Sequence, residues 1–355
     1  MKVIQVVSPG LLTTVQDLGR EGFGPMGVSP SGAADAVALR IGNRLVGNAE
    51  KAAGLEMTLL GGAFQFLQGA VVALAGSDFG AALDGEVVEL WCSFEVKAGQ
   101  RLQLGATRGG ARCYLCVHGG IDVKPFLGSA STHLLSGLGG NEGRALRKGD
   151  VLKISGTGTP VYPELRRARS LSSRTGRSSN QPRKVAARAL EQLRPRKVLR
   201  VTPGPQNEWF SDAAQKIFYE STYRVAEESN RMGLRLEGPA IPDGAHGGAH
   251  GEALGDASGK GLGDGSGRTL GEMISEGVSL GAIQIAAGGL PIILFVEQQT
   301  TGGYAKIANV ISADLHSLGQ LRPRDEIRFE RVDFDTARAL LIEQEELLAS
   351  KQLLV

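Results

Sequence analysis

The chain has 355 residues, a hydrophobic content of 42% and a formal net charge of +2. This length suits two or three domains, and the near-neutral charge gives no indication of a nucleic-acid partner. The sequence contains no apolar run near the roughly 18 residues of a membrane span, and the apolar stretch after Met1 is too short for a signal peptide. We therefore expect a cytoplasmic protein without membrane contact.

Short apolar runs bounded by glycine follow one another along both halves of the chain. Examples are GGAFQF, AVVALAG and ARCYLCV in the first half, and VLRVTPG, GAIQIA and LPIILFV in the second. Together with 51 glycines and only 5% aromatic residues, these runs predict a mainly β, turn-rich protein with a few short helices. We expect one helix near Ala33 capped by Ser31, and another capped by Asn207.

Two stretches of unusual composition divide the chain. Residues 164–197 carry 11 Lys and Arg against 2 Asp and Glu, which indicates a basic linker or long loop, helical in part. Residues 244–271 are rich in Gly and predict an insertion; they match neither a phosphate-binding loop nor a dinucleotide fingerprint. The expected organisation is therefore a β-barrel domain over 1–163, the linker, a second β-barrel domain over 198–335 with this insertion, and a C-terminal helix over 336–355.

The three cysteines do not predict a redox or metal site. Cys113 and Cys116 have the C-x-x-C spacing, but they lie in the strand-like run RCYLCV, where this spacing places two side chains on opposite faces. We expect these residues and Cys92 to be free thiols, buried in the fold. No metal ligand set is predicted elsewhere, and the G-x-S-x-G sequence of residues 277–281 precedes a strand rather than the helix of a hydrolase elbow.

Four polar clusters next to glycines are the candidate binding segments. They are VQDLGREGFGPMGVSPSGAAD (15–35), ESNRMGLRLEGPAI (228–241), EMISEGVSLGAIQI (272–285) and EQQTTGGY (297–304). Glycine lets the backbone approach a ligand closely, and Arg, Gln and Thr are suited to binding a carboxylate or an amide. One interpretation is a common pocket for a compact amide; the other is a set of well-formed turns.

The same segments resemble the allophanate hydrolase subunit 2 family, also described as the KipI-antagonist family, as the C subunit of bacterial 5-oxoprolinase and as a biotin-dependent carboxyltransferase family. The matching motifs run from about Ser8 to Ile327 and include SPGLLTTVQDLGREG, HGGIDV, ESNRMGLRLEG, SEGVSLGAIQI, QTTGGY and ISADLHSLGQLRPRDEI. The resemblance implies two cyclophilin-like β-barrel domains.

The resemblance also implies partners. Family members pair with a KipI-type (allophanate hydrolase subunit 1) protein, and with a third subunit they form an ATP-dependent 5-oxoprolinase that opens 5-oxoproline to glutamate. This activity is our first hypothesis, with the chain inactive alone, no cofactor bound by the chain itself and ATP used by the complex. The alternatives are a carboxyltransferase acting on urea or a related small amide, with biotin carried elsewhere, and a non-enzymatic regulator that binds a KipI-type kinase inhibitor.

The resemblance implies candidate site residues in the matching motifs. Glu276, Arg231 and Gln299 are the candidates for catalysis: Glu276 would move a proton, Arg231 would hold a carboxylate, and Gln299 would bind the amide with Thr300. The remaining candidates for substrate binding are Asp35, Arg40, Ser229, Gln284, Thr301 and Gly302. Each has a structural alternative, a buried hydrogen bond to a turn.

The chain departs from the family pattern at two of these motifs. Ala34 replaces a usual Met beside Asp35, and Glu297-Gln298 replaces a usual Asp-Arg pair before QTTGGY. The missing cation at residue 298 weakens any expectation that carboxybiotin or bicarbonate is held there.

Overall fold

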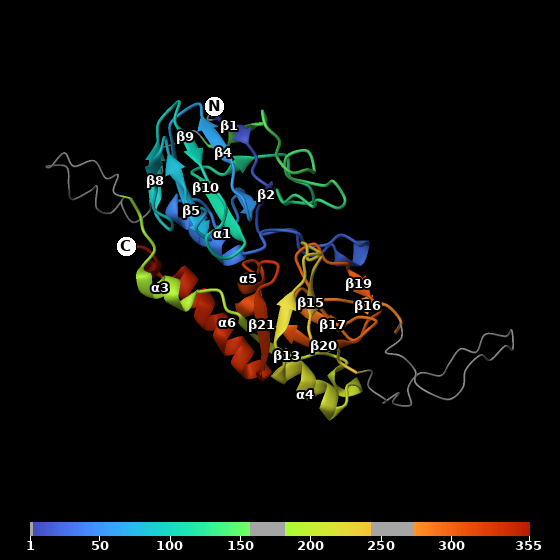
Figure 1. Cartoon of the computed structure of the whole chain (residues 1–355). Coiled ribbons are helices and arrows are strands. Elements are labelled where there is room, and N and C mark those ends of the chain that lie inside the picture. Colours follow the sequence, from blue (N-terminus) through green and yellow to red (C-terminus); the bar gives the residue numbers. More distant parts are fainter. Residues whose placement is uncertain (1–2, 157–181, 243–272) are drawn as a thin grey trace.

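The computed structural model describes residues 3–156, 182–242 and 273–355. Residues 164–181 of the expected linker and the whole expected insertion, 244–271, lie outside the described residues, so the proposed domain limits stay predictions. The described residues are mainly β, as the sequence predicts, with a few short helices (Figure 1). Within them, no helix is long and apolar enough to cross a membrane.

The first half of the chain forms two sheets that enclose one core. The seven-stranded sheet has the order β11 (Ile121–Asp122), β12 (Val151–Ile154), β1 (Val3–Ser8), β4 (Ala63–Phe66), β9 (Arg101–Gln103), β6 (Ala82–Leu83), β7 (Glu86–Val87). The five-stranded sheet has the order β2 (Leu12–Gln16), β3 (Gly54–Thr58), β10 (Arg112–Val117), β5 (Ala70–Gly76), β8 (Ser93–Val96). Phe64 and Phe66 of one sheet and Leu55 and Leu115 of the other are buried together, because alternate residues of each strand face inward.

Helix α1 (Ala36–Leu45) covers the outer face of the five-stranded sheet. Its apolar residues Val37, Ile41 and Leu45 recur at intervals of four and pack on Tyr114 and Cys116 of β10. Strand β10 is therefore buried on both faces, which explains its nearly continuous apolar sequence.

The second half forms a closed barrel. Its strand order is β13 (Val198–Pro203), β20 (Lys306–Val310), β17 (Ala282–Ile285), β18 (Pro291–Leu294), β15 (Gly233–Glu237), β14 (Tyr223–Val225), β21 (Glu326–Arg331). A separate two-stranded sheet joins β16 (Glu276–Gly277) to β19 (Thr301–Gly302). The barrel core contains Phe218, Phe295 and Phe329, and Ala34 of the first half is buried with them.

Short helices connect the strands and cover parts of both halves. They are the 3-10 turns η1 (Gly24–Met26), η2 (Asn207–Trp209), η3 (Ser312–Asp314) and η4 (Lys351–Leu353), and the helices α3 (Ala187–Gln192), α4 (Asp212–Glu220), α5 (Leu315–Leu318) and α6 (Phe334–Ala349). Two expected caps were wrong. Asp35, not Ser31, caps α1 by accepting a hydrogen bond from Ala38 N, and Ser211, not Asn207, caps α4.

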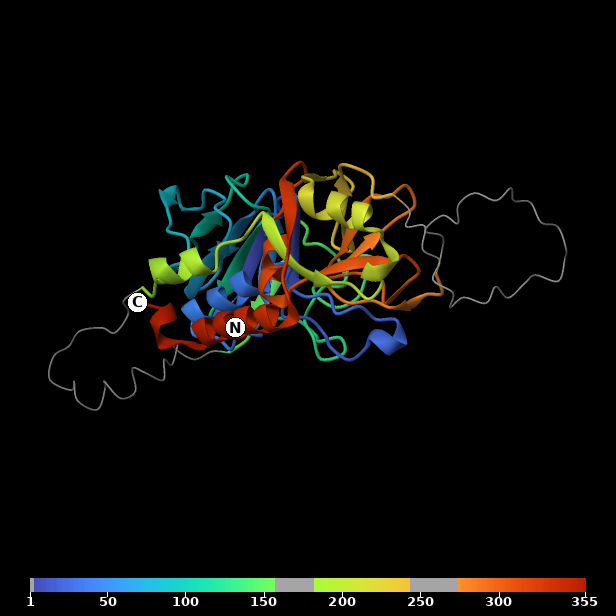
Figure 2. The same cartoon turned by 90° about the horizontal axis from the view of Figure 1, so that it is seen from below.

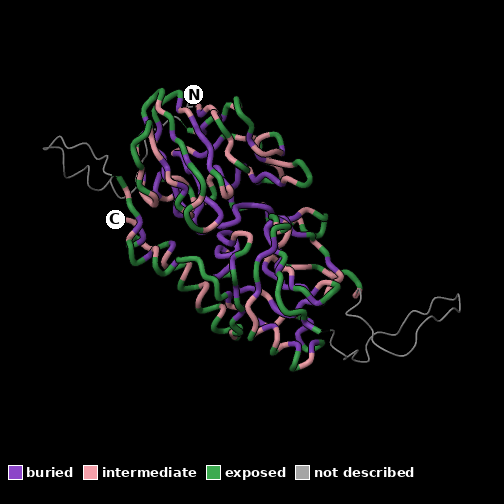
Figure 3. Tube along the Cα trace, in the orientation of Figure 1, coloured by how far each residue is buried: buried purple, intermediate pink, exposed green. Residues whose placement is uncertain are grey.

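Helix α6 leaves the barrel and returns to the first half of the chain. Figures 1 and 2 show it running beside α1, and Arg40 of α1 forms an ion pair with Glu345 at 2.6 Å. Leu348 and Leu353 are buried in the cluster that contains α1, together with Ala189 of α3. Figure 3 shows buried chain continuing through the junction of the two halves.

Candidate functional site

A buried glutamine without a full set of partners marks the candidate site. Gln284 lies on β17 between Ile283 and Ile285, which point into the barrel core, so its side chain points to the opposite face. Only 2% of Gln284 is exposed, yet its Nε2 has no hydrogen-bond partner in the described part of the chain. The Nε2 of Gln299 lies 3.5 Å from the other amide atom, Oε1 of Gln284. A buried amide donor left unpaired is costly, which makes this group a candidate for ligand binding.

Gly302 permits these two amides to meet. A Cβ atom at residue 302 would lie 2.5 Å from Nε2 of Gln284 and 2.6 Å from Nε2 of Gln299. The glycine of QTTGGY therefore makes room for side chains rather than for an unusual backbone angle. The expectation that glycine in this segment lets the backbone approach a ligand stays a prediction, because the close contacts at Gly302 are protein side chains.

The two glutamines line a cavity of about 220 Å³ at the side of the barrel. This volume is below the 300–1,000 Å³ usual for drug-sized ligands and suits a small molecule. The remaining lining residues come from β15, β17, β18 and the segments beside them: Asn230, Met232, Gly233, Arg235, Ala286, Ile292, Leu294 and Tyr304. Three of the four glycine-flanked segments thus meet here, 228–241, 272–285 and 297–304.

An ion pair lies next to this cavity. Lys306 stands opposite Gln284 in the β17–β20 pairing, is 3% exposed, and places Nζ 2.8 Å from Oε1 of Glu276. Gln206 also donates to Glu276, at 2.8 Å. The hydrogen bonds from Lys306 and Gln206 lower the pKa of Glu276 below its usual value. A proton-transfer group near neutral pH needs the opposite shift, so the expected role of Glu276 in moving a proton is not supported by its environment.

The expected role of Arg231 is corrected by its contacts. Its Nη1 donates to Oε1 of Glu56 at 2.5 Å, its Nη2 donates to the carbonyl of Gly32 at 2.6 Å, and its Nε donates to Glu297. The guanidinium is buried and points toward the first half, away from the cavity lined by its neighbours Asn230 and Met232. Arg231 joins the two halves, and all three of its nitrogens bind protein acceptors rather than a substrate.

Other expected site residues lie elsewhere. Asp35 caps α1 and lines a different cavity, Arg40 is paired with Glu50 and Glu345, and the hydroxyl of Ser229 bonds to the backbone of Arg235. One pocket shared by all the candidates was therefore a wrong expectation. Thr301 is exposed on β19, and Thr300 contributes its carbonyl to Val278 N; their substrate roles stay predictions.

Sequence reasoning missed several residues around the site. Arg235 and Tyr304 line the cavity, and Lys306 holds Glu276. The sequence GLRLE alternates, with Leu234 and Leu236 buried and Arg235 exposed. This pattern could have predicted that Arg235 points away from the barrel core. Sequence reasoning did not select Glu56, although it lies in the family-like motif GLEMTLLGG; it binds both Arg231 and Tyr114 in the buried junction.

The three cysteines are free thiols, as the sequence predicts. Cys113 and Cys116 are buried on opposite faces of β10, whereas Cys92 is only half-buried, which corrects the expectation that all three lie inside the fold. Among the residues that the structure describes, no group of three or more His, Cys, Asp or Glu side chains is placed to hold a metal ion.

The described residues form a mainly β protein with a closed barrel and a small polar cavity, and comparison with known proteins gives its family. Residues 26–331 match the family described as carboxyltransferase domain, subdomain A and B. The chain is 36% identical over 335 residues to the C subunit of 5-oxoprolinase from Escherichia coli, covering 94% of this chain and 93% of that protein. It is 34% identical to urea amidolyase of Lachancea kluyveri, covering 95% of this chain but 17% of that protein.

A solved structure gives the same result. The crystal structure of Kluyveromyces lactis urea amidolyase superposes with a TM-score of 0.80 at 30% identity, over 99% of this chain and 21% of that one. The chain belongs to the carboxyltransferase domain A and B family, and the resemblance that its motifs indicate is confirmed.

Proposed function

We propose that the chain is a subunit of an ATP-dependent 5-oxoprolinase complex and that its small cavity binds the lactam. The observation that supports the proposal is the buried Nε2 of Gln284, which has no hydrogen-bond partner among the described residues; Gln284 lines the cavity beside Gln299. The similarity to the C subunit of 5-oxoprolinase over nearly the full length of both chains supports this choice of substrate.

The chemistry of a five-membered lactam matches this cavity. Nε2 of Gln284 would donate to the lactam carbonyl, and the carboxamide oxygen of Gln299 would accept from the lactam N–H. The apolar side chains of Met232, Ile292 and Leu294 would contact the ring carbons. Together these groups would recognise a small cyclic amide by both ends of the amide and by its ring.

The carboxylate of 5-oxoproline requires a cation. Arg235 lines the cavity, and its guanidinium can bind a carboxylate through two parallel hydrogen bonds. We assign Arg235 this role in place of Arg231. The contacts of this chain would bind and orient the lactam. Ring opening adds water across the C–N bond of the lactam and gives glutamate, and in the complex this step is coupled to ATP hydrolysis.

The proposal includes partner chains, because ATP-dependent ring opening needs an ATP site that we do not assign to this chain. We propose a KipI-type protein and a third 5-oxoprolinase subunit as partners in the cytoplasm. The second candidate is a carboxyltransferase for urea or a related amide, favoured by the similarity to urea amidolyase. The ureido ring of biotin carried on another chain is a cyclic urea, which also offers a carbonyl and N–H groups, so the two carboxamides fit it chemically.

The test is 5-oxoproline-dependent ATP hydrolysis by the purified chain mixed with its KipI-type partner and the third subunit. We expect activity only in the full mixture, and at least about a tenfold loss of kcat/KM with Gln284→Ala or Gln299→Ala, the loss of one polar contact of about 1.4 kcal/mol. Gln68→Ala, at an exposed position of the first half, is the matched control. A mixture that transfers carboxylate from carboxybiotin to urea but does not use 5-oxoproline supports the second candidate. Binding of the KipI-type protein without any turnover supports the regulator.

A further inference from the structure

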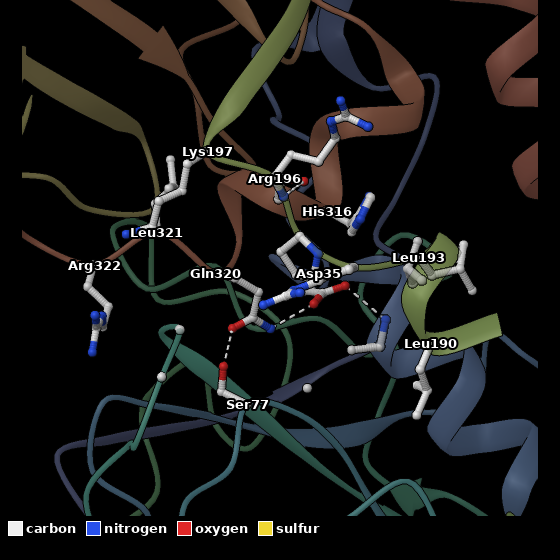
Figure 4. A pocket seen from close by; sticks show the side chains of 18 of the residues that line it. Asp35, Ser77, Leu190, Leu193, Arg196, Lys197, His316, Gln320, Leu321 and Arg322 are labelled. Carbon is white, nitrogen blue, oxygen red and sulfur yellow. Dashed lines mark hydrogen bonds between the residues drawn. The ribbon is translucent and has the colours of Figure 1, made fainter. Parts of the chain in front are cut away.

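A larger cavity lies between the two halves, away from the glutamine pair. Its volume is about 380 Å³, and it is bordered by α1, by α3 with the residues that follow it, and by α5 (Figure 4). Both halves and the chain segment that connects them therefore contribute walls. None of the residues proposed to contact the lactam lines this cavity.

One wall of the cavity contains a buried histidine whose ring makes no hydrogen bond within residues 3–156, 182–242 and 273–355. His316 is 7% exposed, and neither Nδ1 nor Nε2 has a partner among the described residues. The carboxylate of Asp35, also drawn in Figure 4, already accepts two hydrogen bonds, from Ala38 N at 2.8 Å and from Nε2 of Gln320 at 2.7 Å. An imidazole that is nine-tenths buried, faces a cavity and has two unused nitrogens indicates a missing polar ligand.

The charges around the cavity favour an anion. Four cationic side chains line it, Arg194, Arg196, Lys197 and Arg322, against the acidic side chains of Asp35 and Asp325. Lys197 and Arg322 both pair with Asp325. Arg196 has no ion-pair partner in the described segments, and its backbone N–H bonds to the hydroxyl of Ser317, the residue after His316. Burial raises the pKa of the Asp35 carboxyl, and the nearby His316 opposes this shift.

Part of the cavity wall is apolar. It is formed by Val37, Ile41, Trp91, Leu190 and Leu193, which come from α1, from the turn before β8, and from α3 and its C-terminal end. In Figure 4, Leu190 and Leu193 lie on one side of Asp35, and Lys197 and Arg322 lie on the other. The ligand therefore needs an apolar body and one charged end.

We propose that this cavity is a second binding site, for a small carboxylic acid with an apolar chain or ring, whose carboxylate binds His316 and Arg196. A carboxylate can accept from the imidazole N–H of His316, and the exposed side chain of Arg196 can turn toward its other oxygen. The ligand would contact both halves and the connecting segment, so binding would stabilise their arrangement.

The test uses the full-length protein and hexanoate as the probe, with hexanamide as its neutral analogue. We expect hexanoate at millimolar concentration to raise Tm and to give a measurable Kd by calorimetry, whereas hexanamide should bind about tenfold more weakly or worse. His316→Phe and Arg196→Gln should each raise the Kd for hexanoate about tenfold. Arg188→Gln, on the exposed side of α3, should leave it unchanged.

The two variants keep the proposal falsifiable if one of them does not fold. The side chain of Arg196 forms no ion pair within the described segments, so Arg196→Gln should fold even if His316→Phe does not, and its Tm without ligand checks this. The proposal is overturned if hexanoate does not bind the natural chain, if hexanamide binds equally well, or if a folded variant keeps the natural Kd. Because the assay measures binding to the chain alone, its failure leaves the 5-oxoprolinase proposal untouched.

Discussion

Arg231 of the second half and Glu56 of the first half form a buried ion pair, with Nη1 and Oε1 2.5 Å apart and side chains 6% and 1% exposed. Glu56 also accepts from the hydroxyl of Tyr114 at 2.7 Å and from Ala34 N at 2.8 Å, so its two oxygens serve both the ion pair and the start of α1. The pair therefore fixes the junction between the barrel and the two-sheet half. Removing Glu56 leaves Arg231 with Glu297 alone, and removing Arg231 leaves Glu56 with Arg112 at 3.6 Å and takes the cation away from Glu297.

Arg231→Ala should lower the free energy of unfolding by about 3–5 kcal/mol, because Glu56 and Glu297 lose their shared cation in a buried site. Urea denaturation measures this change. The matched control is Arg224→Ala, which removes the exposed pair with Glu237 at 2.6 Å and should cost about 1 kcal/mol or less. Equal losses for the two variants would contradict the assignment of Arg231 to the junction.

Gly302→Ala should impair substrate use more than folding. The added Cβ must displace the ends of Gln284 and Gln299, which we expect to lower kcat/KM in the reconstituted complex about tenfold or more, at a stability cost of about 1–3 kcal/mol. Gly277→Ala on the paired strand β16 is the control, because a Cβ there meets nothing within 4 Å. If Gly302→Ala remains folded with full activity, the position of the two amides does not matter for substrate use.

Glu276 should give a small, pH-dependent contribution to stability. Its folded-state pKa is lowered by Lys306 and Gln206, so its contribution is present above the ordinary value of 4.5 and disappears as pH falls through the lowered pKa. Because its side chain is 42% exposed, we expect Glu276→Gln to cost only about 0.5 kcal/mol at pH 7 and nothing in strong acid. Urea unfolding of both proteins across this range checks the sign. A difference that grows on acidification would refute the lowered pKa.

The thiols of Cys113 and Cys116 should not react with thiol reagents in the folded protein. Burial raises the pKa of both Cys113 and Cys116, and their side chains pack in separate clusters. We expect a thiol reagent to label no more than Cys92 in the native chain and all three cysteines after denaturation in guanidinium. Fast labelling of two thiols in native buffer would show that β10 opens.

The sequence allowed the mainly β fold to be predicted because strands β10, β17 and β18 are apolar runs bounded by turns, and these patterns have a local cause. It also allowed Gln284, Gln299 and Gly302 to be selected, since they lie in motifs that the family shares. The orientation of Arg231 was not predictable. Its backbone lies beside the cavity, but its side chain points toward the carboxylate of Glu56, which is 175 residues away in the sequence. Long-range pairing of this kind leaves no local pattern in the sequence.

The return of α6 to the first half has a consequence for biosynthesis. Arg44 of α1 bonds to the carbonyl of Ser350 across 306 positions, and Leu348 and Leu353 complete the apolar layer over β5 and β10. While the ribosome is still making the barrel, this outer layer lacks part of its cover. The apolar surface of the first half therefore stays partly exposed until α6 and the residues after it have been translated, and chaperones or neighbouring nascent chains can bind it during this time.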